Sequence, residues 1–310
     1  MSFLYDRYLK IKTRNFKGDF PRGFPIANFD NYYTLEDAID WLKTRLPDVQ
    51  QPFLGYFHFL PPHDPYNTRL DFYDYFLNDR FKPTKKVESV FSYHKNQHYL
   101  NTQRTHYDEF ILYVDEEFNR LFEYLEKSGL LENTHVILTS DHGELFERGI
   151  NGHSSEVLYQ PLVHIPLVIF EPGRTKREDI YTPTSAIDIL PTLLYWSNKK
   201  IPSWCEGNIL PPFNASGTGS NRSVFSVQAR NNDKYSSFKH ATIMLLKENY
   251  KLTYGYGYEE LKDIGDLVEL YDIQNDPEEL ENLYPTRKTL GDELLAEVKA
   301  KLSEVNAPYE

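Results

Sequence analysis

The sequence has almost no cysteine and no long apolar segment. Cys205 is the only cysteine among 310 residues, so the chain can form neither an internal disulfide nor a cluster of thiolates around zinc. No segment approaches the ~20 consecutive apolar residues that cross a bilayer, and the first residues contain no apolar stretch of signal-peptide length. These absences favour, by default, a cytoplasmic protein without a membrane segment.

Positive charge is also scarce, whereas aromatic residues are abundant. The 34 basic and 46 acidic residues give a net charge of −12, which argues against broad binding to nucleic acid phosphates. A small anionic substrate is not excluded, because a metal ion can invert the field within one pocket. The 24 Tyr and 20 Phe can bury large areas, and a chain of this length can enclose one large core or two unequal ones.

Strands and helices alternate through the first two thirds of the chain. Apolar spacing predicts helices over residues 35–46, where Thr34 can cap the start, and over 102–128 and 186–196. Short apolar runs predict buried strands at 53–60, 135–139 and 165–170. This alternation is typical of an α/β domain with a largely parallel sheet, which binds ligands beyond the carboxyl ends of its strands. The polar residues 64–100 between these elements are expected to form a long surface excursion.

The last third has a different organisation. Residues 211–222 are rich in Pro, Gly, Ser and Asn and are typical of a linker. Strand-like runs at 223–227 and 241–246, a hairpin at 251–258 and a helix at 290–305 then follow. We therefore predict two domains, an α/β domain over residues 1–212 and a small α+β subdomain over 222–310, built from an antiparallel sheet and a helix.

Asp141 and His142 form the first candidate site, directly after the predicted strand 135–139. Gly143 follows them, and its missing side chain permits a sharp turn and a close backbone approach that would let both side chains reach one ion. A carboxylate beside an imidazole suits Mg, Mn, Ca or Zn. Taken alone, the pair is more simply explained as a cap and a surface histidine.

Two further histidines lie in loops predicted at the same edge of the sheet. His63 stands among prolines after the predicted strand 53–60, and the prolines restrict its backbone. His153 lies in the polar loop GINGHSSE, where an imidazole could bind an anionic oxygen or donate a proton to a leaving group. Each alone is an ordinary loop histidine, but together with Asp141 and His142 they favour a metal-assisted hydrolase.

The order of several longer motifs resembles the sulfatase family, within the alkaline-phosphatase-like superfamily. These motifs are FHFLPPHDPY, the helix–strand segment LYVDEEFNRLFEYLEKSGLLENTHVILTSDHGELF, HIPLVIFEPG, SAIDILPTLLYWS and VELYDIQNDPEELENLY. The resemblance covers about residues 52–284. It implies a mixed, mostly parallel sheet flanked by helices, with a small C-terminal subdomain that closes one side of a cleft.

The resemblance also implies roles for the candidate residues. Asp141 and His142 match the later pair of metal ligands, for one divalent ion such as Ca, Mn or Mg. His63 matches a histidine that contacts the sulfate or phosphate group. His153 falls where relatives place a Lys or His against the substrate oxyanion, as a catalytic and substrate-binding residue. The implied partner is a small sulfated, or phosphorylated, substrate.

One part of the family pattern is missing from these 310 residues. Relatives begin with a strand ending in Asp-Asp and later carry Cys/Ser-x-Pro-x-Arg, whose first residue becomes the nucleophile. Neither motif occurs here, and Cys205 lies in the unrelated context Cys-Glu-Gly-Asn-Ile. Three interpretations stay open: a sulfate ester hydrolase lacking its nucleophile half, a phosphoester hydrolase or phosphoglycerol-transferase-like enzyme, and a non-catalytic protein or a subunit completed by a separately encoded N-terminal half.

Overall fold

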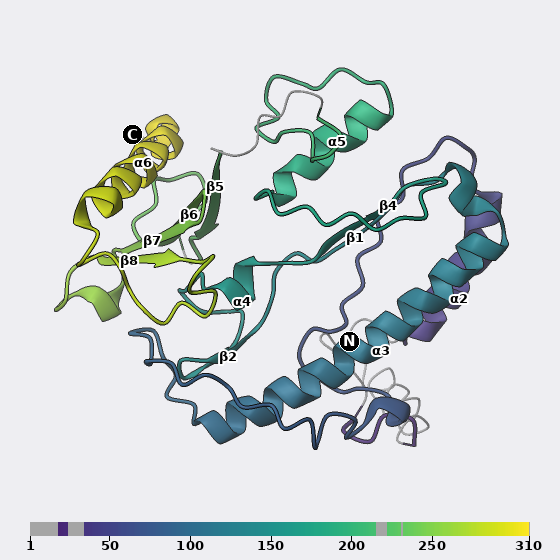
Figure 1. The fold of residues 1–310 in the computed structure, drawn as a ribbon, viewed down its shortest axis with the longest axis horizontal. Coiled ribbons are helices and arrows are strands. Elements are labelled where there is room, and N and C mark those ends of the chain that lie inside the picture. The colour runs from purple at the N-terminus through teal and green to yellow at the C-terminus, as the bar shows by residue number, and fades with distance from the viewer. Residues whose placement is uncertain (1–17, 24–33, 215–221, 231, 310) are drawn as a thin grey trace, which may run out of the picture. The chain divides into compact units, whose positions relative to one another are not determined.

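The computed structural model describes residues 18–23, 34–214, 222–230 and 232–309. They form two compact units (Figure 1). The first unit holds the described residues up to 83 together with 94–137 and 168–174, and the second holds 84–93, 138–167 and the described residues from 175 onward. The domain boundary predicted near residues 212–222 stays a prediction, since much of that segment lies outside the described residues.

Two packed helices dominate the first unit (Figure 1). Helix α2 spans Leu35–Arg45, and Thr34 starts it because its hydroxyl accepts from the Asp37 amide while the Asp37 carboxylate accepts from the Thr34 amide. Helix α3 spans Gln97–Lys127. It begins five residues before the predicted start because the Asn96 side chain caps it, accepting from the Tyr99 amide at 2.9 Å.

The prediction of a buried strand at residues 53–60 is wrong. This segment has no regular secondary structure, and Leu54 and Tyr56 are 72% and 82% exposed. A strand needs a neighbour that satisfies its amides and carbonyls, and no strand formed by the described residues pairs with this segment.

Strands β1, Val136–Thr139, and β4, Leu167–Phe170, pair with each other. The division between the two units runs through both strands. Their side chains are partly exposed rather than buried as predicted. These are the strands of the main sheet that the described residues provide.

The second unit is built around a four-stranded antiparallel sheet. Its strands follow chain order: β5 Ser223–Gln228, β6 Ala241–Lys247, β7 Tyr250–Tyr256 and β8 Leu267–Asp272. The predicted hairpin at 251–258 is wrong, because residues 251–256 belong to the single strand β7. The turn lies before this strand, at Glu248, whose φ is +53°. Helix α6, Lys288–Asn306, lies alongside the sheet and packs on β6 and β7 (Figure 1).

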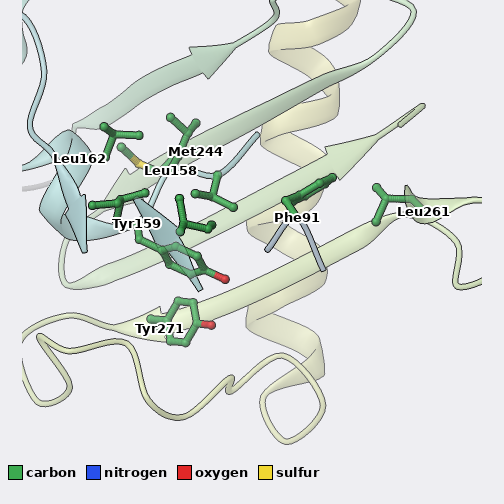
Figure 2. Close-up of a cluster of buried hydrophobic side chains, with 10 residues drawn as sticks. Phe91, Leu158, Tyr159, Leu162, Met244, Leu261 and Tyr271 are labelled. Atoms are coloured by element: carbon green, nitrogen blue, oxygen red, sulfur yellow. The ribbon is translucent and has the colours of Figure 1, made fainter. Parts of the chain in front are cut away.

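Alternate residues of β6 separate two hydrophobic clusters. Ile243 and Leu245 pack toward Leu294 and Val298 of α6. Met244 faces the opposite way and joins Phe91, Tyr159, Leu162 and other buried side chains (Figure 2). The second cluster holds the chain around residues 145–162 against the sheet.

Short elements complete the second unit. Strands β2, Leu145–Glu147, and β3, Ile150–Gly152, form a hairpin, and α4 spans Gln160–Val163. A 3₁₀ turn at Ala186–Asp188 leads into α5, Ile189–Trp196. Across both units, the other 3₁₀ turns are Leu46–Asp48, Leu70–Phe72, Leu130–Asn133, Glu259–Leu261 and Ala307–Tyr309. No helix among the described residues is both long and apolar enough to cross a membrane.

Candidate functional site

A tight backbone contact shapes the turn that carries Asp141 and His142. The Gly143 amide donates to the Leu162 carbonyl at 2.8 Å, and the Glu144 amide donates to the Pro161 carbonyl at 3.1 Å. A Cβ on Gly143 would lie 2.0 Å from the Pro161 oxygen, so only glycine fits. The close backbone approach expected at Gly143 is therefore present, and helix α4 provides the surface against which the turn is fixed.

The His142 ring is held in one tautomer. Its Nδ1 lies 2.8 Å from the Gly143 carbonyl oxygen, which can only accept, so Nδ1 carries a proton. The Nε2 atom lies 3.8 Å from the Asp141 Oδ1 atom. Asp141 also accepts the His142 amide at 3.0 Å. A hydrogen-bonded Nδ1 with Nε2 turned to a carboxylate is the arrangement of a ligating histidine.

His153 lies against His142. The centroids of the two rings are 4.1 Å apart, and the His153 Nδ1 lies 3.0 Å and 3.2 Å from the two Glu144 carboxylate oxygens. Glu144 is almost fully buried. Its hydrogen bond raises the pKa of the His153 imidazole above the usual value, and burial partly opposes this effect. The buried carboxylate orients the His153 ring through Nδ1.

His63 belongs to the first unit and is described only there. Its Nδ1 lies 2.7 Å from the Asp64 carbonyl oxygen, so this ring also carries its proton on Nδ1. Its amide donates to the Leu60 carbonyl at 2.8 Å. Asp141, His142 and His153 are therefore together in the second unit, and the expected placement of His63 in the same cavity stays a prediction.

The donor atoms of Asp141 and His142 fit part of a divalent metal site. A carboxylate oxygen and an imidazole nitrogen are both good ligands for such ions, and both side chains are partly exposed, at 61% and 37%. Among the described residues, however, no group of three or more His, Cys, Asp or Glu is arranged to hold an ion. The donor atoms of the pair are suited to supply two ligands.

Sequence reasoning missed Glu144 and the hairpin β2–β3 that follows it. The only signal for Glu144 was an acidic residue nine positions before His153. The hairpin was concealed because its turn is Arg148-Gly149, with φ of +53° and +77°, rather than the usual Asn-Gly or Asp-Gly. Cys205, which was expected to have no catalytic role, is a partly buried thiol.

Comparison of the structure with solved proteins defines the class of fold. Phosphonate monoester hydrolase from Silicibacter pomeroyi has a TM-score of 0.71, with 18% identity, over 99% of this chain and 69% of its own. This similarity, together with the mixed arrangement of helices and sheets, makes the chain an alkaline-phosphatase-like α/β protein, as predicted. The family model named Sulfatase matches residues 10–199. The chain belongs to the sulfatase family.

Other similarities concern the C-terminal part and the extent of the match. The model "N-sulphoglucosamine sulphohydrolase, C-terminal" matches residues 153–308. A solved protein in complex with its substrate D-glucosamine-2-N,6-O-disulfate is 28% identical over 67% of this chain and 42% of its own, with a TM-score of 0.50. The multifunctional alkaline phosphatase superfamily protein PehA of Trinickia caryophylli is 24% identical over 86% of this chain and 57% of its own. The chain spans about half the length of the curated relatives that it matches.

Proposed function

We propose that this chain supplies the metal-binding and sulfate-binding part of a hydrolase of sulfate monoesters. Asp141 and His142 hold one divalent ion, which we expect to be Ca, Mn or Mg, and His153 and His63 contact the sulfate group. The observation that carries this proposal is the hydrogen bonding of the three histidines. In each ring an oxygen acceptor lies within hydrogen-bond distance of Nδ1 and sets the orientation of the imidazole, as in metal-binding and anion-binding histidines.

The roles of the residues follow from their contacts. A bound divalent ion would offset the charge of the sulfate oxygens and polarise a nucleophile. Glu144 holds His153 through Nδ1, which aims the other nitrogen at the ester for a charge-assisted hydrogen bond or for proton donation to the leaving oxygen. The His142 ring lies against His153, with centroids 4.1 Å apart and an interplanar angle of 31°, and so limits the rotation of the His153 ring.

Sulfated amino sugars are the substrates to test first. The model that matches residues 153–308 is that of an N-sulphoglucosamine sulphohydrolase, and the solved relative binds a glucosamine disulfate. The alternative is hydrolysis of phosphate or phosphonate esters, favoured by the similarity to PehA, which is described as multifunctional. Assays of matched aryl sulfate and aryl phosphate esters on the completed protein separate the two activities.

The first prediction concerns metal affinity. The 310-residue chain should bind Mn²⁺ weakly, with a Kd above about 10⁻⁴ M, because two ligands replace few of the waters that the ion gives up. Asp141→Ala should remove this binding, as measured by water-proton relaxation and by paramagnetic broadening of the His142 ring signals. Asp233→Ala is the matched control, since Asp233 is an exposed carboxylate paired only with Lys239 among the described residues. Equal affinity in the Asp141 variant and the parent would contradict the assignment.

The second prediction concerns activity. Residues 1–310 contain no Cys/Ser-x-Pro-x-Arg motif, and water held in an incomplete shell lacks the positioning that contributes much of catalysis. The chain alone should therefore hydrolyse aryl sulfates no faster than the buffer. Addition of the family's nucleophile-bearing half, in the same chain or as a separate subunit, should restore turnover, and Asp141→Ala should then lower it at least ~10³-fold. Turnover by the isolated chain that survives Asp141→Ala would show that the site lies elsewhere.

A further inference from the structure

Two hydrogen bonds of its backbone hold Arg230 in place. It lies two residues beyond the end of β5, where its amide donates to the Gln228 side-chain oxygen at 3.1 Å. Its carbonyl oxygen accepts from the His240 Nε2 atom at 3.0 Å. The backbone of an exposed turn is usually mobile, whereas these two hydrogen bonds fix the backbone from which the Arg230 side chain extends.

The same contacts fix Arg230 beside the loop that carries His153. The Gln228 Nε2 atom donates to the Ser155 carbonyl at 3.0 Å, and the Thr242 hydroxyl donates to the Glu156 carbonyl at 2.5 Å. Ser155 is almost fully buried. Gln228 thus joins the Arg230 turn to the residue two positions after His153.

Tyr93 also contacts this loop. Its hydroxyl donates to the Ser154 carbonyl at 3.1 Å, and its amide donates to the Gly149 carbonyl at 3.2 Å. The side chain is nevertheless 49% exposed. A partly exposed aromatic ring can pack against the apolar face of a sugar, and the bond of the Tyr93 hydroxyl holds this ring beside the residue that follows His153.

The charge of Arg230 acts electrostatically on both His153 and Tyr93. It lowers the pKa of His153, against the larger effect of Glu144, and the pKa of Tyr93, which burial raises overall. Glu156 and Glu260 act on Tyr93 in the opposite direction. Among the described residues, Arg230 forms no ion pair, although a guanidinium is well suited to bidentate binding of a carboxylate or sulfate.

We propose that Arg230 and Tyr93 form an outer subsite for a second anionic group, a sulfate or a carboxylate, on the sugar whose ester lies at His153. The inference rests on the proposed function, because it takes the position of the ester from His153. The sugar ring packs on Tyr93, and the guanidinium binds the additional anion. The subsite therefore selects sugars that carry two anionic groups over those that carry the ester alone.

The test compares four ligands on the 310-residue chain in the presence of Ca²⁺, and their binding is followed by the His153 and His142 ring signals in NMR titrations. The ligands are inorganic sulfate, glucosamine 6-sulfate and glucosamine 2-N,6-O-disulfate, with a monosulfated uronic acid as the carboxylate counterpart of the last. We expect the dianionic sugars to bind about tenfold more tightly than glucosamine 6-sulfate, which is the usual value of one charge-assisted contact. Arg230→Gln should abolish that preference and leave the affinity for inorganic sulfate unchanged.

Two variants control this result. Arg177→Gln removes an exposed arginine that pairs with Asp179 in the same unit, so it reproduces the change in net charge and should keep the preference. Tyr93→Ala should weaken all three sugars to a similar degree without affecting inorganic sulfate. A preference for only the disulfate or only the uronic acid identifies the anion that the subsite takes.

The two possible failures can be told apart. If inorganic sulfate shifts the histidine signals but Arg230→Gln leaves the preference intact, or no dianionic sugar is preferred, the outer subsite is wrong and the proposed function stands. If inorganic sulfate leaves the His142 and His153 signals unchanged, both the sulfate site and the subsite are wrong.

Discussion

Lys251→Met should lower the free energy of unfolding by about 3–5 kcal/mol, because it leaves a buried carboxylate without its partner. Lys251 and Glu279 are 0% and 1% exposed, and their charged atoms are 2.6 Å apart. Lys251 lies in β7, in register with Tyr271 of β8, on the side of the sheet that carries the cluster around Met244 and Tyr159. Urea unfolding at neutral pH, monitored by tyrosine and tryptophan fluorescence, measures the loss.

Two further variants show whether burial is responsible. Lys247→Met breaks the Lys247–Glu297 pair on the neighbouring strand, where both side chains are 33% exposed, and should cost no more than about 1 kcal/mol. The double variant Lys251→Met, Glu279→Gln removes the uncompensated charge and keeps an acceptor for the Gln160 amide, which lies 2.7 Å from Glu279. It should recover at least about half of the loss. An equal loss of unfolding free energy in the Lys247 and Lys251 variants would show that burial does not increase the cost of breaking the pair.

Gly143→Ala should disrupt both stability and metal binding. The added Cβ would lie 2.0 Å from the Pro161 oxygen, so the backbone has to move and the bond from the Gly143 amide to Leu162 has to lengthen. We expect a loss of about 3 kcal/mol in stability. Because the displaced turn carries Asp141 and His142, a shift near 1 Å should weaken Mn²⁺ binding, or turnover of the completed enzyme, by about 10²-fold.

Gly18→Ala is the matched control for this substitution. A Cβ on Gly18 would meet nothing within 4 Å, and this glycine is not among those with positive φ. It should change stability by less than about 0.5 kcal/mol. If Gly143→Ala kept full stability and metal affinity, the close contact with α4 would not be what positions the site.

The sequence predicted those elements whose signals are local. The capping pair of Thr34 and Asp37 marks the start of α2, and the apolar spacing of α5 and α6 comes within two or three residues of their observed bounds. The turn after β1 was also predictable, because the glycine of Asp-His-Gly at the end of an apolar run permits a sharp turn and a close backbone approach.

Features that depend on distant contacts were not predictable. The run at 53–60 is as apolar as a buried strand, but its conformation depends on a neighbouring strand that no local pattern reveals. The role of Glu144 depends on the β2–β3 hairpin, which folds the chain back so that His153 meets it. Arg230 and Tyr93 lie 77 and 60 positions from His153, and only the folded chain brings them near the same loop.

The contacts of Glu279 also bear on the order in which the molecule is made. Its carboxylate accepts from the Gln160 amide at the start of α4 and from Lys251, and its carbonyl accepts from Arg148. The turn at Gly143 is hydrogen-bonded to α4. During synthesis, Asp141 and His142 leave the ribosome more than 130 residues before the side chain that secures their support. We therefore expect a nascent chain stalled before residue 279 to lack the ordered ligand pair, so that metal uptake is a late event, after the C-terminal sheet has closed.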